Sequence, residues 1–522
     1  MKAVSSETMR KLDSAAIHDY DVPGEVLMDR AGFAVAAWVR RIADTAGNSQ
    51  AAVLLIAGRG NNGGDVFAAA RYLKEWQMDV EVWLAGDPAK VTGDAARHMS
   101  RMRGAGIPLR AMPAREDWAD LQLSPGDLPD IAVDGVIGTG INGPVRGPAA
   151  SAIHYLRALA QHIPVIAIDI PSGLNSDTGE PEGECVRADM TVTMGMPKTG
   201  LLQPSALDYV GNIEVADIGI VPELMDTVQS DIELITPFDL YKLLPARSRN
   251  AHKGDCGHTL IIAGAPGYAG AAILSARAAC RSGTGLVSVL TPESVQQIVA
   301  AGVPDAMVHS APAGIGGGLT ANALEALPQK INEYSAVLAG PGITASKDSV
   351  ALIEKLLDVC RVPMVLDADA LNALGSNPQK IAQAGAARVI TPHPGEAARL
   401  LGVPSADIQA DRRAAISKLT AATAATVILK GAGTLVQAPE TSQWINLTGN
   451  PGMATGGMGD VLAGYLTGLL AQGIAPFDAA RLAVFLHGRA ADLCAWRHSQ
   501  AGLTASDLVT ELAGITREIA PR

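Results

Sequence analysis

The sequence predicts two α/β domains, each with a mostly parallel sheet between layers of helices. The chain has 522 residues, more than one hydrophobic core normally serves. Short apolar runs alternate with helical patterns along both halves, which is the rhythm of βαβ units. This alternation thins near residues 225–235, where prolines and acids precede a basic stretch, as in a linker. We therefore expect domains at residues 1–225 and 232–522.

The first half begins with an amphipathic helix, predicted over residues 25–44 from apolar positions at helical spacing. Continuous apolar runs, typical of strands buried on both faces, follow it. The strands are predicted within 53–58, 79–86, 130–138, 163–173 and 188–195, with helical patterns such as 149–162 between them. This order indicates a doubly wound, Rossmann-like sheet.

The second half repeats the alternation without sequence similarity to the first. A strand is predicted within 258–265 and a helix over 270–285. Further strands are predicted within 286–292, 335–342, 362–371, 387–396 and 426–436. Two helices, over 458–473 and 478–494, are predicted to close the chain.

The composition excludes several classes of protein. The formal net charge of -12 argues against a nucleic-acid or anionic-membrane partner, although backbone amides can still bind an anion locally. The five cysteines are scattered and form no CxxC pair, which favours reduced thiols. Neither a signal peptide nor an apolar run of membrane-spanning length is found. We expect a soluble, cytoplasmic protein.

The stretch "GRGNNGGDV", residues 58–66, lies between a predicted strand and a predicted helix. Glycines at such a turn let the backbone approach a phosphate, and the helix start offers free N–H groups. Asn61 and Asn62 add side-chain donors and acceptors. Asp65 could instead cap the helix. The pattern therefore predicts a phosphate site, with a capped turn as the alternative.

Two further turns fall on the same edge of the predicted sheet. Asp134 lies within one strand and is followed by a glycine-rich loop, whereas Asp169 and Ser172 end another strand. An acid in an apolar strand is costly to bury unless it is paired or binds a cation. Together with Asn62, these residues could supply oxygens to a small hard cation. Capping of neighbouring turns by the two carboxylates remains open.

In the second half, "ATGGMGDVLAG" places Asp460 at the start of an apolar helix. Amides at a helix start can neutralise a phosphoryl group in transit, and an Asp beside them could accept a proton. Asp460 could also be a simple helix cap. Lys430, in the turn "KGAGT", could contact a phosphate or be solvated.

Three more polar residues follow predicted strands. His393 lies between two prolines in "TPHPGE", where a rigid, partly exposed histidine could bind substrate or be structural. Asp367 and Asp369 in "LDADALN" could bind a metal or cap the loop, and the loop role is favoured.

The first-half motifs "LMDRAG", "GRGNNGGD", "VDGVIGTG" and "DIPSG" resemble those of the YjeF N-terminal domain, the NAD(P)H-hydrate epimerase, over residues 1 to about 220. The resemblance implies a potassium ion at Asn62, Asp134 and Ser172. It also implies that Asp169 acts at the nicotinamide ring with Lys198 nearby. The residues implied to hold the substrate phosphates are Asn61, Asn62, Gly63, Gly64, Asp65, Gly138, Thr139, Gly140, Ile141, Asn142, Gly143 and Pro144.

The second half resembles the ribokinase-like fold and, more closely, the ADP-dependent NAD(P)H-hydrate dehydratase. The motifs are "HKGDCGHTLIIAG", "GPG", "TPHPGE", "KGAGT" and "GGMGD", over about residues 235–515. The resemblance implies that ADP, with Mg²⁺, is the co-substrate. The residues implied to contact the hydrate are Ala271, Gly342, His393 and Asp460, and those implied to contact the nucleotide are Lys430, Gly431, Ala432, Gly433, Thr434 and Gly459.

The resemblance as a whole implies a bifunctional repair enzyme and, we expect, a homo-oligomer. One half would interconvert the R and S epimers of hydrated NAD(P)H. The other would dehydrate the S epimer to NAD(P)H, using ADP and releasing AMP and phosphate. Two alternatives remain at this point: an ATP-dependent small-molecule kinase, since fold alone does not define the reaction, and a first half that serves only as a binding module.

Overall fold

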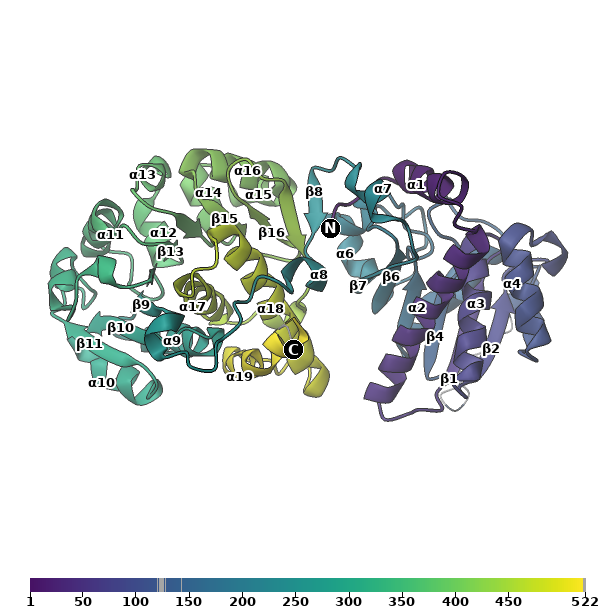
Figure 1. Cartoon of the computed structure of the whole chain (residues 1–522), viewed down its shortest axis with the longest axis horizontal. Coiled ribbons are helices and arrows are strands. Elements are labelled where there is room, and N and C mark those ends of the chain that lie inside the picture. Colours follow the sequence, from purple (N-terminus) through teal and green to yellow (C-terminus); the bar gives the residue numbers. More distant parts are fainter. Residues whose placement is uncertain (120, 122–125, 127, 142, 520–522) are drawn as a thin grey trace. The chain divides into compact units, whose positions relative to one another are not determined.

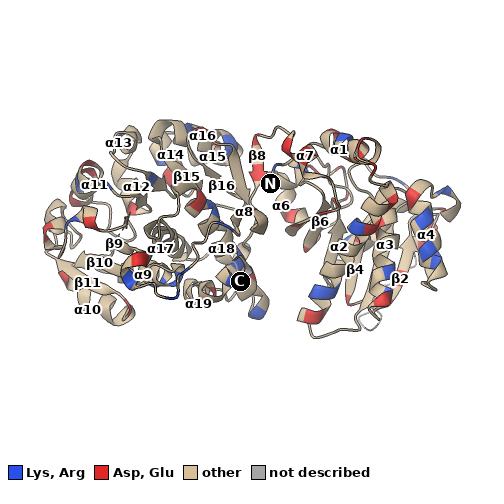
Figure 2. Cartoon of the chain, in the orientation of Figure 1, with Lys and Arg blue, Asp and Glu red and all other residues tan. Residues whose placement is uncertain are grey.

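The computed structural model describes residues 1–119, 121, 126, 128–141 and 143–519. The chain divides into two compact units, Met1–Asp231 and Ile232–Arg522 (Figure 1). Each unit has its own sheet, and helices pack against it. The predicted α/β class is therefore confirmed. Basic and acidic residues are interspersed on the elements of both units (Figure 2).

The sheet of the first unit has seven parallel strands in the order β3-β2-β1-β4-β5-β6-β7. The strands are β1 (Ala52–Ala57), β2 (Asp79–Leu84), β3 (Leu109–Ala111), β4 (Ile131–Gly135), β5 (Val165–Ile168), β6 (Met190–Met194) and β7 (Asn212–Ala216). All five predicted strands are present. The edge strands β3 and β7 are additional, and both are short and incompletely buried, so neither produces a continuous apolar run.

Helices cover both faces of this sheet. They are α1 (Ser6–His18), α2 (Gly24–Thr45), α3 (Asn61–Glu75), α4 (Gly93–Gly104), α5 (Pro148–Leu159), α6 (Leu207–Val210) and α7 (Pro222–Asp226). Successive residues of β1 face opposite cores. Val53 and Leu55 pack with residues of α2 and α3, whereas Leu54 and Ile56 pack with residues of α5. Burial on both faces explains the uninterrupted apolar run of this strand.

The second unit has a ten-stranded sheet in the order β11-β10-β9-β12-β13-β14-β15-β16-β17-β8. Its strands are β8 (Ile232–Leu234), β9 (His258–Ile262), β10 (Leu286–Pro292), β11 (Met307–Ala311), β12 (Ala336–Ala339), β13 (Met364–Leu366), β14 (Arg388–Ile390), β15 (Thr426–Leu429), β16 (Thr434–Gln437) and β17 (Gln443–Asn446). Pairing is antiparallel only at β15–β16 and β16–β17 among the described strands. The segment assigned to a linker contains β8, which pairs with β17 and extends the sheet.

The helices of the second unit are α8 (Pro237–Leu240), α9 (Ala269–Ser282), α10 (Glu293–Gly302), α11 (Lys347–Val359), α12 (Asp369–Leu374), α13 (Gln379–Ala382), α14 (Pro394–Leu401), α15 (Ser405–Ala410), α16 (Arg412–Thr423), α17 (Met458–Ala471), α18 (Pro476–Arg497) and α19 (Ala505–Ile515). The prediction that two helices close the chain is wrong, because α19 follows α18 and packs on it and on α9. Thr504 and Asp507 form a capping box at the start of α19. This local signal is visible in the sequence but was not considered in a prediction from hydrophobic periodicity alone.

Each sheet has a point where the strand order reverses. In the first unit β1 lies between β2 and β4, and in the second β9 lies between β10 and β12. The connections that leave neighbouring strands at such a point go to opposite faces and open a crevice at the carboxyl edge. The glycine-rich turns after β1 and β4 lie at the first of these points.

Candidate functional sites

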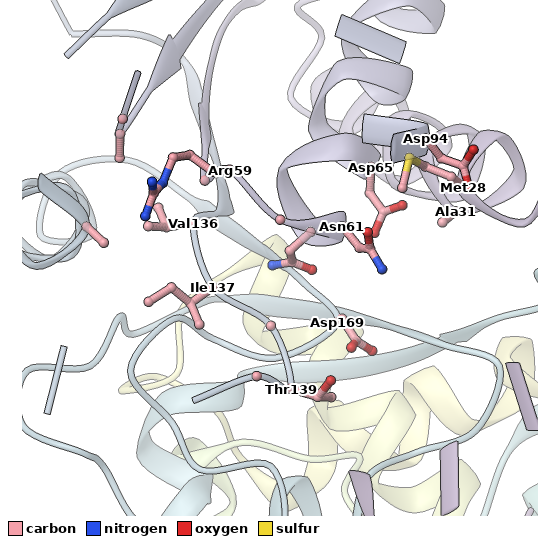
Figure 3. Close-up of a pocket in the computed structure, with 18 of the residues that line it drawn as sticks. Met28, Ala31, Arg59, Asn61, Asp65, Asp94, Val136, Ile137, Thr139 and Asp169 are labelled. Atoms are coloured by element: carbon pink, nitrogen blue, oxygen red, sulfur yellow. The ribbon is translucent and has the colours of Figure 1, made fainter. Parts of the chain in front are cut away.

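A cavity of about 880 Å³ opens in the first unit (Figure 3). Its walls come from the turns that follow β1 and β4, from α1 and α2, and from the residue after β5. Seven of the predicted site residues line it, namely Asn61, Asn62, Asp65, Gly138, Thr139, Gly140 and Asp169. The strand-order reversal thus forms the expected crevice, and these predicted residues meet there.

The glycine turn is the first turn of α3, which begins at Asn61. Gly58 and Gly63 allow tight packing, since a Cβ on Gly58 would lie 1.9 Å from the Val136 carbonyl oxygen, and one on Gly63 would lie 1.9 Å from the Gly58 oxygen. Gly60 is the N-cap and makes no side-chain cap, so the alternative of Asp65 as the cap is wrong. Within the described residues, nothing accepts a hydrogen bond from the amides of Asn61, Asn62 and Gly63. These amides are available to an anion.

Asp134 and Ser172 contact each other beneath the cavity. Ser172 donates from its amide to Asp134 Oδ2 at 2.7 Å and from its hydroxyl to Oδ1 at 2.6 Å. Asp134 is 0% exposed, and burial raises its pKa to about 6, although the bonds from Ser172 and Val136 oppose this rise. Asn62 Nδ2 donates to the Ile168 carbonyl at 3.1 Å. The carboxylate thus holds neighbouring turns, the role left open above, and has only neutral hydrogen-bond partners among the described residues.

Asp169 lies directly after β5 with a left-handed φ of 65°. Its Oδ1 accepts hydrogen bonds from the Thr193 hydroxyl and the Met194 amide, both at 3.1 Å, and forms a short ion pair with Lys198. Lys198 is 1% exposed and also donates to the Met194 carbonyl at 2.8 Å. All three donors converge on one oxygen, which leaves Asp169 Oδ2 for a ligand in the cavity. Residues other than glycine rarely adopt this backbone conformation, and those that do are concentrated at functional sites.

Two further acids line the cavity. Burial raises the pKa of Asp13 to about 6, with Asp169 adding to the rise and Lys198 opposing it. Burial raises the pKa of Asp65 well above its usual range, and Asp169 and Asp13 add to this rise. Sequence reasoning missed Asp13. The signal was its position one helical turn from Met9 and Ala16, which places an acid on the apolar face of α1.

Other predicted residues of the first unit lie near the cavity without lining it. Gly63, Gly64, Lys198, Asp134 and Ser172 are buried behind its wall. Ile141, Gly143 and Pro144 continue the loop after Gly140 and are not among the lining residues. Asn142 lies outside the described residues.

The second unit gathers charged side chains from three strand ends. Lys430, after β15, lies 2.8 Å from Oδ1 of the buried Asp367, after β13, and 3.8 Å from Glu396 Oε2 in α14. Burial alone would lower the pKa of Lys430, but Asp367 and Glu396 outweigh it and the pKa is raised. Burial raises the pKa of Glu396 to about 7. Lys430 is therefore an ion-paired cation rather than a solvated strand-end lysine.

Asp460 lies in the first turn of α17, close to this group. The N-cap of α17 is Gly457, with a φ of 91° and no side-chain cap, so the alternative of Asp460 as a helix cap is wrong. A Cβ on Gly459 would lie 3.4 Å from Lys430 Nζ and 3.9 Å from Asp367 Oδ2. Burial, with Asp367, raises the pKa of Asp460 to about 7, and Lys430 opposes the rise. A carboxyl group with this pKa suits proton transfer near neutral pH.

His393 begins α14 and is half exposed. Its Nδ1 accepts a hydrogen bond from the Gly395 amide at 3.0 Å, and its own amide donates to Glu396 Oε2 at 2.8 Å. Burial, together with Lys430, lowers the pKa of His393. Neutral His393 thus has a structural role as the cap of α14. Half of its side chain is still exposed, so the structural role does not prevent substrate binding.

Ala271 and Gly342 touch at the other strand-order reversal. Gly342 has a φ of 63°, and a Cβ there would lie 3.2 Å from the Ala271 Cβ. Asp369 Oδ2 accepts a hydrogen bond from the Thr344 amide at 3.0 Å, which is the loop-capping role predicted for it. Small residues after β9 and β12 therefore meet at the carboxyl edge.

The turn from Lys430 to Thr434 connects β15 and β16. Gly431 and Gly433 have φ values of 143° and 60°, which only glycine adopts readily. Arg412 of α16 donates to the carbonyls of Leu429, at 3.1 Å, and Ala432. Arg412 was not among the predicted residues, because no motif marks a side chain that fixes a distant turn.

These features define a two-domain α/β protein with a turn of free amides in one domain and a group of buried acids with a lysine at a helix start in the other. Residues 24–200 match the family described as YjeF-related protein N-terminus, and residues 259–513 match NAD(P)H-hydrate dehydratase. A bifunctional NAD(P)H-hydrate repair enzyme from Moorella thermoacetica is 38% identical over 99% of this chain and 97% of its own. One from Coxiella burnetii is 37% identical over 88% and 89%, respectively. The chain belongs to this family of bifunctional NAD(P)H-hydrate repair enzymes, as the motifs predicted.

A solved structure also resembles the second unit. It is an ADP/ATP-dependent NAD(P)H-hydrate dehydratase from Bacillus subtilis, co-crystallised with ATP and Mg²⁺. It is 30% identical, covers 55% of this chain and 98% of its own, and has a TM-score of 0.49.

Membrane-spanning helices and clusters of metal-binding His, Cys, Asp or Glu side chains are both absent from the described residues. Within them, no helix is long and apolar enough to cross a membrane. In the same ranges, no three His, Cys, Asp or Glu side chains are grouped to hold a metal ion.

Proposed function

We propose that this protein repairs hydrated NAD(P)H in two steps. The first unit epimerises the R and S hydrates, and the second dehydrates the S epimer with ADP, giving NAD(P)H, AMP and phosphate. Family membership supports the pair of activities. The observation that carries the division of labour is that each unit has its own group of titratable residues at the carboxyl ends of its own strands.

In the first unit, the free amides of Asn61 to Gly63 would hold the substrate pyrophosphate at the start of α3. The loop from Gly138 to Gly140 forms the facing wall of the cavity. Asp169 would act at the ring, because its Oδ1 is fixed by three donors while Oδ2 stays available. Lys198 orients Asp169 from behind and so would be a positioning residue.

Potassium is the proposed cation of this site. Asp134 is fully buried and, among the described residues, has hydrogen bonds only from neutral donors. Such a carboxylate lacks a balancing charge. Oxygens of Asn62, Asp134 and Ser172 would hold the ion, which would offset the negative charge beside the substrate phosphates. The residue types fit a monovalent cation, since one carboxylate is joined by neutral oxygens.

In the second unit, Asp460 would accept the proton of the ring hydroxyl as that oxygen attacks the terminal phosphorus of ADP. The bond from phosphorus to the AMP oxygen breaks as the new one forms. The ring nitrogen lone pair then expels phosphate, and loss of a proton from the adjacent carbon restores the dihydronicotinamide. Amides at the start of α17 would stabilise the phosphoryl group. Lys430 to Thr434 would contact the nucleotide, while His393, Ala271 and Gly342 would contact the hydrate.

Mg²⁺ bound with ADP would neutralise phosphate charge during the transfer. Asp367 Oδ2 fits a role in holding it, because this buried oxygen has no hydrogen-bond partner among the described residues. Its Oδ1 is already fixed by Lys430 and by the Thr391 hydroxyl at 2.7 Å. One protein carboxylate is sufficient where the substrate phosphates supply further oxygens.

A single assay tests this proposal. The full chain is given a mixture of both epimers with ADP, and the absorbance of reduced nicotinamide and the nucleotide products are followed. We expect complete recovery of NAD(P)H from both epimers, with one AMP formed per molecule repaired. Recovery of the S fraction alone would contradict the epimerase assignment. No recovery of NAD(P)H with ADP, together with phosphorylation of the substrate when ATP replaces ADP, would indicate a kinase.

A further inference from the structure

Asp13 is held close to the ring-binding end of the cavity by the way α1 is anchored. The Val4 amide donates to the Pro197 carbonyl, and the Thr199 amide donates to the Val4 carbonyl, both at 2.9 Å. These bonds join the segment before α1 to the segment that carries Lys198. The start of α1 is also fixed by Ser6, whose hydroxyl donates to Asp177 at 2.8 Å. The position of Asp13 is therefore coupled to that of Lys198 and Asp169.

The side chain of Asp13 lies on the apolar side of α1 and lines the cavity. Its Oδ1 is buried and has no hydrogen-bond partner among the described residues. Leaving a buried polar atom without a partner costs about 1–3 kcal/mol, so such atoms call for an explanation. No hydrogen bond holds either oxygen of Asp13 among the described residues, so the side chain is available to a group bound in the cavity.

The buried charges that interact with Asp13 are mainly acidic, although Arg59, Lys90 and Arg146 line other parts of the cavity. Asp65 and Asp169 face Asp13, and Lys198 is the buried cation among them, already paired with Asp169. Arg10 lies one turn away on α1 and also lines the cavity. Burial raises the pKa of Asp13 to about 6 and that of Asp65 further. Asp13 is therefore a carboxyl group of the cavity wall, close to the Asp169–Lys198 pair, that can exchange a proton near neutral pH.

The three carboxyl groups are not packed together. They interact electrostatically, yet no three acids in the described part of the chain are close enough to share a metal ion. Asp13 and Asp169 line the same cavity, so both carboxyl groups are available to one bound ring. Epimerisation by loss and re-addition of water, at a carbon bearing a hydroxyl and a ring nitrogen, needs an acid for the departing oxygen and a base for the entering water.

We propose that Asp13 is a second catalytic residue of the epimerase, and that it protonates the departing ring hydroxyl while Asp169 receives the proton of the water that replaces it. This inference rests on the proposed epimerase function of the first unit. The carbon–oxygen bond breaks, the hydroxyl leaves as water with the proton of Asp13, and the nitrogen lone pair forms a carbon–nitrogen double bond. Water then adds to the opposite face, loses a proton to Asp169, and the electron pair returns to nitrogen. The reverse reaction, or exchange with solvent, restores the proton to Asp13.

The test is the full chain carrying Asp13→Asn, assayed without ADP by chiral chromatography of the two epimers. The change is nearly isosteric and removes only the acid. We expect the interconversion rate to fall by about 10²–10⁴-fold. Glu7→Gln is the matched control, because Glu7 is an exposed acid of the same helix paired only with Lys11 among the described residues. Retention of more than about a tenth of the wild-type rate in Asp13→Asn overturns the inference.

Two further measurements separate catalysis from structure. Asp13→Ala should lose the activity and regain part of it with added formate or acetate, a rescue that a structural role does not give. In water carrying a heavy oxygen isotope, the wild type should label both epimers at the rate of epimerisation. Loss of activity with lowered thermal stability and no rescue, or epimerisation without label, would overturn the role of Asp13. A wild type that does not epimerise at all would instead contradict the proposed function.

Discussion

Lys430 and Asp367 form a buried ion pair, with Nζ 2.8 Å from Oδ1, beneath the first turn of α17. The lysine side chain is 20% exposed and the aspartate side chain 1%. The pair places one positive charge close to Asp460 and Gly459 before any nucleotide binds. The pair joins two strand ends, and we propose that its lysine also contacts the nucleotide phosphates.

Replacing Lys430 by Met should destabilise the second unit. Removing one partner leaves Asp367 and Glu396 buried without their cation, and breaking a buried pair typically costs about 3–5 kcal/mol. The free energy of unfolding measured in urea checks this. Lys418→Met, on the exposed side of α16, is the control and should change stability by less than about 0.5 kcal/mol. A loss below about 1 kcal/mol in Lys430→Met would show that the pair has little structural role.

Asp460→Asn should abolish dehydration of the S hydrate and leave epimerisation unchanged. The substitution keeps the shape and removes the base, so turnover should fall by about 10²–10⁴-fold. Asp358→Asn, an exposed change on α11, is the matched control. If Asp460→Asn keeps more than about a tenth of the wild-type turnover with ADP, another group is the base.

The pH dependence of the dehydration rate should report the ionisation of Asp460. The pKa of Asp460 is raised to about 7, and a base must be ionised to accept a proton. The rate on S hydrate at low substrate should therefore rise as the pH increases through about 7 and level off above it. A rate that is flat between pH 6 and about 8 would not be consistent with this assignment.

Asn62→Ala should weaken substrate binding and epimerisation while the ADP-dependent step on pure S hydrate stays normal. Replacing potassium by lithium in the wild type should have the same effect, because lithium is much smaller than potassium and holds its hydration water more tightly. Asn48→Ala, in the loop after α2, is a suitable control. Equal epimerase rates in potassium and lithium would contradict the cation site and leave the amides of Asn61 to Gly63 as the phosphate site.

The two units should be separable. Each has its own hydrophobic cores, and we propose the boundary at residue 231. Residues 1–231 alone should epimerise without nucleotide, and residues 232–522 alone should consume only the S epimer with ADP. Chiral chromatography of the remaining substrate measures both. Consumption of both epimers by residues 232–522 would overturn the division of labour.

Cytoplasmic location and homo-oligomerisation stay predictions.

The sequence by itself determined the α/β class and the turns that carry chemistry. Two glycine-rich turns could be recognised in the sequence, Gly58 to Asp65 and Gly457 to Asp460. Glycines and the start of a helix follow one another directly in the chain there. The positions of Asp134 within its strand and of Ser172 just beyond the next strand followed in the same way. Family resemblance then supplied roles that periodicity alone does not give.

Tertiary structure decided which of these turns lie together and which acids are buried without a basic partner. The pairing of Lys430 with Asp367, 63 residues earlier, depends on the order of strands in the sheet. Asp13 entered the first cavity only because α1 is bonded to the segment around Lys198. The physical reason is that a turn is a local property of the backbone, whereas burial and charge balance depend on every element packed around a side chain.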